Sequence, residues 1–290
     1  MMKRILHSIR FLLLLVTLSQ IMLSCSETEE FEQQSVDVTF TAAVRNGVQT
    51  RAGDGEYAYG SGKYATTLLV AVFNNDEMPQ IIGEPQEFHI DPLSSSGNNV
   101  TINLTKNQTY NIIFWAYNKE AEVYDLTQLP KVTMIAPGEA MTFEQADAMD
   151  AFYAVVRYTA TAGNTPETVP LKRPLAQINV GTSGTAVPAT FKVEGTYNTF
   201  YPFDGTFSGE ATFSWAFNET TTNTFQIKDN PEQYTYLVLG YLFAPLGEDT
   251  EAVKKTCQLE LTETDREIPP FQDVELHANR RSNIVGSFTE

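Results

Sequence analysis

The chain has 290 residues, with 36 acidic side chains against 19 basic ones, and its formal net charge is −17 at pH 7. A chain this acidic repels phosphate backbones, and because it carries no basic stripe we exclude nucleic acid as a partner. Its length is enough for two domains. With only two cysteines and three histidines, it offers little material for a disulfide framework or a metal centre.

The N-terminus has a basic start followed by an uncharged apolar run. Lys3, Arg4 and Arg10 carry positive charge, and Phe11–Leu23 (FLLLLVTLSQIML) carries none. This order is typical of a secretory signal peptide. The run is also short for a membrane span, which needs roughly 20 apolar residues. We therefore assign residues 1–24 to a signal peptide.

A cysteine directly follows the apolar run. The segment Met22–Cys25 (MLSC) resembles a bacterial lipoprotein lipobox, except that leucine usually stands where this chain has Met22. The resemblance implies that Cys25 is lipidated on its sulfur and becomes the first residue of the mature chain. Each buried methylene contributes about 0.8 kcal/mol, so several acyl chains together hold a protein on a membrane. The alternative is cleavage elsewhere, with Cys25 an incidental thiol.

Residues 25–35 form an acidic tether that begins Cys-Ser-Glu-Thr-Glu-Glu. Such acids after the cysteine resemble the surface-export signal of lipoproteins in some Gram-negative anaerobes, and an ordinary solvated tether is the alternative. Removal of residues 1–24 would leave 16 basic against 36 acidic side chains, a formal charge of −20.

Short apolar stretches separated by turn residues follow, and their pattern favours strands. Alternation is strict from Val36 to Val44, whereas Thr67–Phe73 is continuously apolar, as expected of a strand buried on both faces. Val100–Leu104 alternates again. Further aromatic and β-branched runs typical of strands are Tyr110–Tyr117 and Phe152–Tyr158. One helical candidate, Gly138–Tyr153, is too short and interrupted to anchor a helical domain.

A segment rich in threonine, glycine and proline, Thr159–Pro170, marks a boundary. The strand-like stretches beyond it are Pro174–Val180, Ala189–Gly195, Gly209–Phe217, Tyr234–Phe243, Cys257–Thr262 and Asn283–Phe288. Many short strands with frequent turns bury their faces best against a second sheet. We predict an all-β protein of two consecutive β-sandwich domains, an N-terminal one over residues 36–165 and a C-terminal one over residues 166–290.

Catalytic signatures find no match in the sequence. His89 and His277 lie in strand-like patterns and in different predicted domains, so an ordinary structural role is the better interpretation. There is no G-x-S-x-G, H-E-x-x-H or C-x-x-C motif. Gly60–Tyr64 (GSGKY) lacks the spacing of a phosphate loop and leads into a strand, so no helix N-terminus would face the phosphates. Cys257 alternates within a strand pattern, which indicates a buried inert thiol.

Paired carboxylates could hydrolyse glycosides, and Asp147, Asp150 and Asp204 are the candidates. Acids are so common here that pairs arise by chance, and solvated surface is the better interpretation. We predict no enzyme, no cofactor and no metal.

The glycine-rich segment Asn46–Gly62 contains a single arginine, Arg51. Proteases nick exposed loops of this composition. A cut after Arg51 would separate the preceding strand, with any lipid anchor, from everything downstream. If that strand lies along a sheet edge, its removal opens a template that another chain can fill by donor-strand complementation. The alternative is an uncut tether or hairpin loop.

Several motifs resemble the fimbrillins, the lipoprotein subunits of type V pili. They are Leu171–Val180 (LKRPLAQINV), Tyr110–Tyr117 (YNIIFWAY), Ala278–Gly286 (ANRRSNIVG), Thr50–Gly55 (TRAGDG) and Asp147–Val155 (DAMDAFYAV). The resemblance implies two transthyretin-like β-sandwich domains, export as a lipoprotein, removal of the first strand by an arginine-specific protease, and polymerisation by strand exchange between subunits.

Carried over to this chain, Cys25 is the lipidation site and Arg51 is the processing site. The apolar residues of the displaced strand are Val36, Val38, Phe40, Ala42 and Val44. Arg173 and Arg280 belong to the matching motifs, with structural roles in salt bridges or solvated edges. The implied partners are other pilus subunits, the outer membrane through lipidated Cys25, and host or bacterial surface ligands. The implied location is the surface of a Gram-negative bacterium.

Few residues follow Gly286, so a free C-terminal arm would be short at about 3.3 Å per residue. This favours a terminal subunit, an anchor or a tip, or a protein that never polymerises. A sequence truncated at this end would also explain the short arm. One rival is a surface lipoprotein that binds glycans or other nutrients through exposed aromatic residues such as Trp215, Tyr197 or Tyr201. The other rival is an unrecognised hydrolase.

Overall fold

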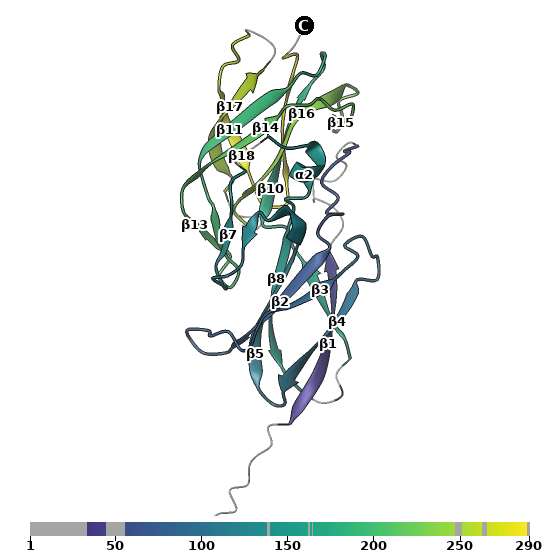
Figure 1. Cartoon of the computed structure of the whole chain (residues 1–290), viewed down its shortest axis with the longest axis vertical. Helices are drawn as coiled ribbons and strands as arrows, with labels where there is room; N and C mark the ends of the chain where they lie inside the picture. The colour runs from purple at the N-terminus through teal and green to yellow at the C-terminus, as the bar shows by residue number, and fades with distance from the viewer. Residues whose placement is uncertain are drawn as a thin grey trace, which may run out of the picture. The chain divides into compact units, whose positions relative to one another are not determined.

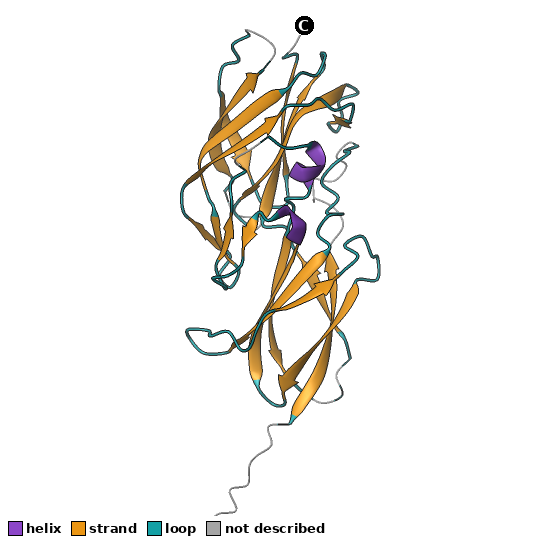
Figure 2. Cartoon of the chain, in the orientation of Figure 1, coloured by secondary structure: helices purple, strands orange, loops and turns teal. Residues whose placement is uncertain are grey.

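The computed structural model describes residues 34–44, 56–137, 140–161, 163, 165–246, 251–262 and 266–288. Strands dominate these residues (Figure 2), so the all-β prediction is confirmed. Residues 36–290 form one compact unit, and of the residues before it only Gln34 and Ser35 are described. Among the described residues, none belongs to a helix that is both long and apolar enough to cross a membrane.

The first two sheets are formed mainly by strands from the N-terminal half of the chain (Figure 1). Sheet 1 consists, in spatial order, of β4 (Asn98–Thr105), β1 (Ser35–Val44) and β9 (Glu167–Leu171). Sheet 2 consists of β3 (Gln86–His89), β2 (Thr67–Asn74), β5 (Thr109–Tyr117) and β8 (Phe152–Thr159).

The other three sheets contain the remaining named strands. Sheet 3 consists of β13 (Thr206–Ser208), β12 (Thr199–Tyr201), β7 (Val132–Met134) and β6 (Tyr124–Asp125). Sheet 4 consists of β15 (Thr224–Gln226), β16 (Gln233–Phe243), β10 (Leu175–Thr182) and β19 (Arg281–Gly286). Sheet 5 consists of β14 (Ala211–Phe217), β11 (Ala189–Thr196), β17 (Val253–Leu261) and β18 (Phe271–Leu276).

The two central strands of sheet 2, β2 and β5, are buried on both faces, and this explains why they lack strict alternation. Leu68 and Phe114 point into a core shared with sheet 1, which we call the first core. Leu69 and Trp115 point the other way, into a larger core that also holds the interior of sheets 3, 4 and 5. A strand covered on both sides has no solvated face, so continuous apolar runs are required. The prediction of a doubly buried strand at Thr67–Phe73 is thereby confirmed.

Sheets 4 and 5 supply most of the larger core. Trp215 of β14 is fully buried and lies against Gly240 of β16, where an added Cβ would come within 2.5 Å of the indole. A glycine is therefore needed at this contact, because any side chain would force the two sheets apart.

The predicted helical segment is mostly not helical. The α-helix α2 (Phe143–Asp147) is five residues long and starts with a capping box formed by Thr142 and Gln145. The other helical element is the 3-10 helix η1 (Lys119–Ala121). After α2 the chain turns and enters β8, because Phe152 and the residues beyond it pair with β5.

The division into domains at residue 165 stays a prediction. Strand β9 begins at Glu167 and completes sheet 1 beside β1. Sheet 3 combines β6 and β7 with β12 and β13, which come from the two sides of the predicted boundary.

Candidate functional site

The first strand, β1, is the central strand of sheet 1 and lies between β4 and β9. The edge position that we supposed for this strand is therefore not the observed one. The local pattern showed which side chains of β1 are buried, but the flanking strands come from residues far along the chain. Removal of β1 would consequently open two strand edges instead of one.

Alternate side chains of β1 fill the first core. Val38, Phe40, Ala42 and Val44 are each at most 5% exposed, while Val36 is only partly buried and packs against the same core. Phe40 is enclosed completely, and its ring makes edge contacts with Phe114 and Tyr158 at centroid distances of 5.2 and 5.0 Å. The predicted apolar row thus lies on one face, as the alternation required.

Polar side chains on the opposite face of β1 form hydrogen bonds with side chains of β4. The Asp37 carboxylate accepts from Asn103, the Thr39 and Thr101 hydroxyls share a bond, and the Thr41 hydroxyl donates to Asn99, at 2.7–2.8 Å. The partners descend along β4 as β1 ascends, so the two strands are antiparallel. On its other side β1 runs parallel to β9, with Phe40–Val44 registered against Glu167–Leu171.

The predicted lipidation and processing sites, Cys25 and Arg51, lie outside the described residues. They stay predictions. The described chain resumes at Glu56, five positions after Arg51, in a segment that we call the strap, residues 56–62.

The strap is fixed to sheet 4 and to α2. The Tyr57 ring stacks on Phe225, with the Arg281 guanidinium 4.0 Å from the centre of the tyrosine ring. The Tyr59 ring stacks on Phe143, and its hydroxyl accepts from Asn223 at 2.5 Å. These contacts hold the chain firmly just downstream of the predicted cut.

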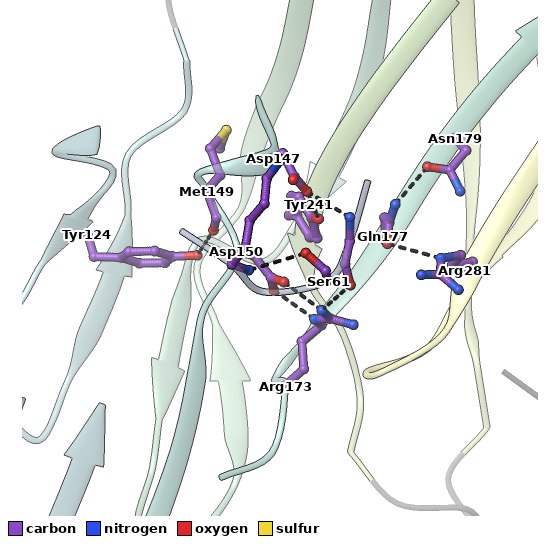
Figure 3. A network of polar contacts seen from close by, with 12 residues as sticks. Ser61, Tyr124, Asp147, Met149, Asp150, Arg173, Gln177, Asn179, Tyr241 and Arg281 are labelled. Carbon is purple, nitrogen blue, oxygen red and sulfur yellow. Dashed lines mark hydrogen bonds and ion pairs between the residues drawn. The ribbon is translucent and has the colours of Figure 1, made fainter. Parts of the chain in front are cut away.

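Gly60 of the strap bonds to a buried polar cluster. Figure 3 labels the side chains of Asp147, Asp150 and Arg173 in this cluster. The N–H of Gly60 donates to Asp147 at 2.8 Å, and its carbonyl accepts from Arg173 at 2.9 Å. Its φ is +91°, and a Cβ here would lie 2.2 Å from the Gln177 side chain. Both the backbone conformation and the space therefore demand glycine.

Arg173 and Asp150 form a buried ion pair within this cluster. Arg173 donates through Nε and Nη2 to the two carboxylate oxygens of Asp150, at 2.7 and 2.5 Å, and both side chains are at most 2% exposed. Burial opposes the charge of Arg173, but Asp150 more than offsets this, so the pKa of Arg173 is raised. The structural role predicted for Arg173 is confirmed.

Asp147 lies beside this pair and is 1% exposed. Burial, reinforced by the charge of Asp150, raises the pKa of Asp147 to about 6, although bonds from Gly60 and the Tyr241 hydroxyl oppose the shift. The prediction that the candidate carboxylates are solvated is thus wrong for Asp147 and Asp150, and right for Asp204. The two buried acids accept hydrogen bonds from the strap and from Arg173.

The other residues considered for catalysis or metal binding, His89, His277 and Cys257, do not form a common site. His89 is exposed on β3, while His277 is buried beyond β18 with Nδ1 3.1 Å from the Ala278 carbonyl. Cys257 is a buried free thiol whose pKa burial raises to about 12, which confirms the inert interpretation. In the described part of the chain, no three histidine, cysteine, aspartate or glutamate side chains gather as metal ligands. Trp215, proposed for glycan binding, is fully buried and does not reach the surface.

The model of a family of unknown function, DUF6562, matches residues 29–289. Among solved structures, a candidate polysaccharide-binding protein from Bacteroides thetaiotaomicron is 12% identical, with a TM-score of 0.53 over 86% of this chain and 89% of that one. A candidate adhesin from Bacteroides ovatus is 12% identical, with a TM-score of 0.51 over 87% and 86%. At these identities the likeness shows a shared fold.

The fimbrial anchor protein Mfa2 from Porphyromonas gingivalis also matches, at 16% identity over 82% of each chain. Its TM-score of 0.47 is too low to carry an argument. None of the curated proteins matches this chain in sequence.

Proposed function

Because the chain belongs to the DUF6562 family, whose function is unknown, we propose that it is a cell-surface fimbrial or adhesive subunit. In this proposal the chain is anchored through lipidated Cys25 and cut after Arg51. It is then joined to another subunit by a donor strand that replaces β1. Its fold, shared with a candidate adhesin, supports a role in adhesion and no catalytic role.

The position of β1 is the observation that carries the proposal. It is the first strand of the chain, it fills the centre of sheet 1, and Arg51 follows its last residue, Val44, by seven positions. Its removal would leave the inner edges of β4 and β9 unpaired and uncover the sites of four buried side chains. Unpaired edges over an apolar groove are a template for strand addition.

The lipid anchor and β1 lie on the same side of the proposed cut. Ten positions separate Cys25 from Ser35, a distance of about 33 Å if extended. The uncut protein is therefore held at the outer membrane close to β1. The strap stays with the body after the cut, since its contacts are made to sheet 4 and α2.

The last described strand, β19, is an edge strand of sheet 4. Residues Arg281–Gly286 pair with β10 and are partly buried. We propose that the chain accepts a strand at the place of β1, between β4 and β9, as a terminal anchor or tip subunit would. Its adhesive ligands would be molecules on host or bacterial surfaces.

The test is digestion of the purified, unlipidated protein with an arginine-specific protease, followed by intact-mass measurement and electrophoresis without heating. The expected product begins at Ala52, retains a stable core, and takes up a synthetic β1 peptide after mild denaturation. Arg51→Ala is the matched control and should resist that cut. Resistance of the wild-type chain at Arg51, or unfolding of the core once it is cut there, would refute the proposal.

A further inference from the structure

We propose that the site filled by β1 selects its replacement strand by size at two successive buried positions: an aromatic ring where Phe40 lies and nothing larger than alanine where Ala42 lies. The inference rests on the proposed strand exchange and goes further, because it specifies the sequence of the partner. The partner is an extended arm of another protein with the order aromatic, polar, small.

The Phe40 position is built for a ring. Its side chain is 0% exposed, and Phe114 of β5 and Tyr158 of β8 meet it edge-on at interplanar angles of 65° and 71°. Edge-to-face pairs are favourable beyond the area that they bury. A smaller residue would leave a cavity between three strands.

The Ala42 position is closed from two directions. Ala42 is 1% exposed and is registered against the fully buried Val169 of β9. The turn before β4 also passes close to the strand here, since a Cβ added at Gly97 would lie 3.0 Å from the Ala42 carbonyl oxygen and 2.8 Å from Thr41 Cγ2. The backbone therefore cannot shift outward to admit a larger side chain without moving β4 or its turn.

The polar face of β1 fixes which side of the donor points inward. A one-residue slip would bury the polar row that contains Asp37, Thr39 and Thr41, so it is excluded. A two-residue slip that moves Ala43 to the place of Thr41 would put an apolar side chain opposite Asn99 and Ala42 at the Phe40 site. A slip in the other direction, which moves Thr39 to the place of Thr41, keeps polar side chains opposite Asn99 and Thr101, and this face hardly resists it. The same slip would place the aromatic ring at the Ala42 site. The different sizes of the Phe40 and Ala42 sites therefore set the register of the donor strand.

The test uses the full mature chain cut after Arg51, with fluorescent peptides of the sequence Val36–Val44 measured by anisotropy. The parent peptide is compared with versions that carry F40A, A42F or A43F. Ala43 is the matched control because it is the neighbouring alanine on the half-buried outer face. We expect about a hundredfold weaker binding for F40A and at least about tenfold for A42F. The A43F peptide should bind within about threefold of the parent.

Equal losses for A42F and A43F, or no loss for A42F, would overturn the selection rule while leaving strand exchange intact. Failure of every peptide, the parent included, would instead refute the proposed function and the rule with it. A second measurement does not depend on exchange of β1 for the peptide, which is slow. In the intact uncut chain, A42F should lower the thermal unfolding midpoint and A43F should not. An equal effect of the two substitutions would also overturn the rule.

Discussion

Replacement of Asp147 by asparagine should stabilise the protein at neutral pH. The carboxyl is buried, and its pKa is raised from 3.8 to about 6 by burial first and by the neighbouring Asp150. Above pH 6 the folded protein must therefore keep a poorly solvated negative charge. Asparagine keeps the oxygen that accepts from Gly60 and Tyr241 and removes that charge.

The size of the stabilisation follows from the shift in the pKa of Asp147. Two pKa units correspond to about 3 kcal/mol of unfolding free energy. A folded-state pKa above the unfolded value means that the folded state binds the proton more tightly. This group therefore adds stability as the pH falls from 6 towards 4 and costs stability above 6. The D147N protein should lack this dependence, so its advantage over wild type should grow by about 2 kcal/mol between pH 4 and pH 7, because the unfolded wild-type chain is already more than half ionised at Asp147 at pH 4.

Urea unfolding of both proteins at pH 4, 5, 6 and 7 would measure the difference. Asp204→Asn is the control, because Asp204 is exposed and also accepts two bonds, from the N–H and hydroxyl of Thr206. It should show no comparable rise. A difference between D147N and wild type that stays constant from pH 4 to pH 7 would refute the reasoning from burial.

Three further outcomes are expected. Arg173→Met should lower the free energy of unfolding, measured in urea, by about 3–5 kcal/mol, because it leaves the buried Asp150 charge without a partner. Adding D150N to the same chain should restore part of that loss, and no restoration would contradict a buried ion pair. Gly60→Val should clash with Gln177 and free the strap, seen as faster hydrogen exchange of residues 56–62; unchanged exchange would show that the strap accommodates a side chain. Cys257 should resist alkylation by iodoacetamide in the folded protein and react once it is unfolded, since it is buried with a pKa of about 12; fast labelling of the native state would contradict its burial.

Local sequence patterns determined many of the strands of this protein and the inward face of β1, but not β9, which begins inside the predicted boundary segment Thr159–Pro170. Strict alternation over Val36–Val44 can bury only one row of side chains, and the continuous run at Thr67–Phe73 permits no solvated face. These are short-range properties. The structure places both segments as strands with the buried faces that their patterns predict.

Only the tertiary structure decided what lies beside each strand and which polar groups turn inward. The central place of β1 depends on β9, more than 120 positions away in the chain. In the sequence, Asp147 does not differ from the other acidic residues of an acidic chain. Its hydrogen-bond partner Gly60 is 87 residues away, and Arg173, which also bonds to Gly60, is 113 residues from it. Strand order and the burial of a charge depend on contacts between distant segments, and a local sequence pattern does not show which segments will pack together.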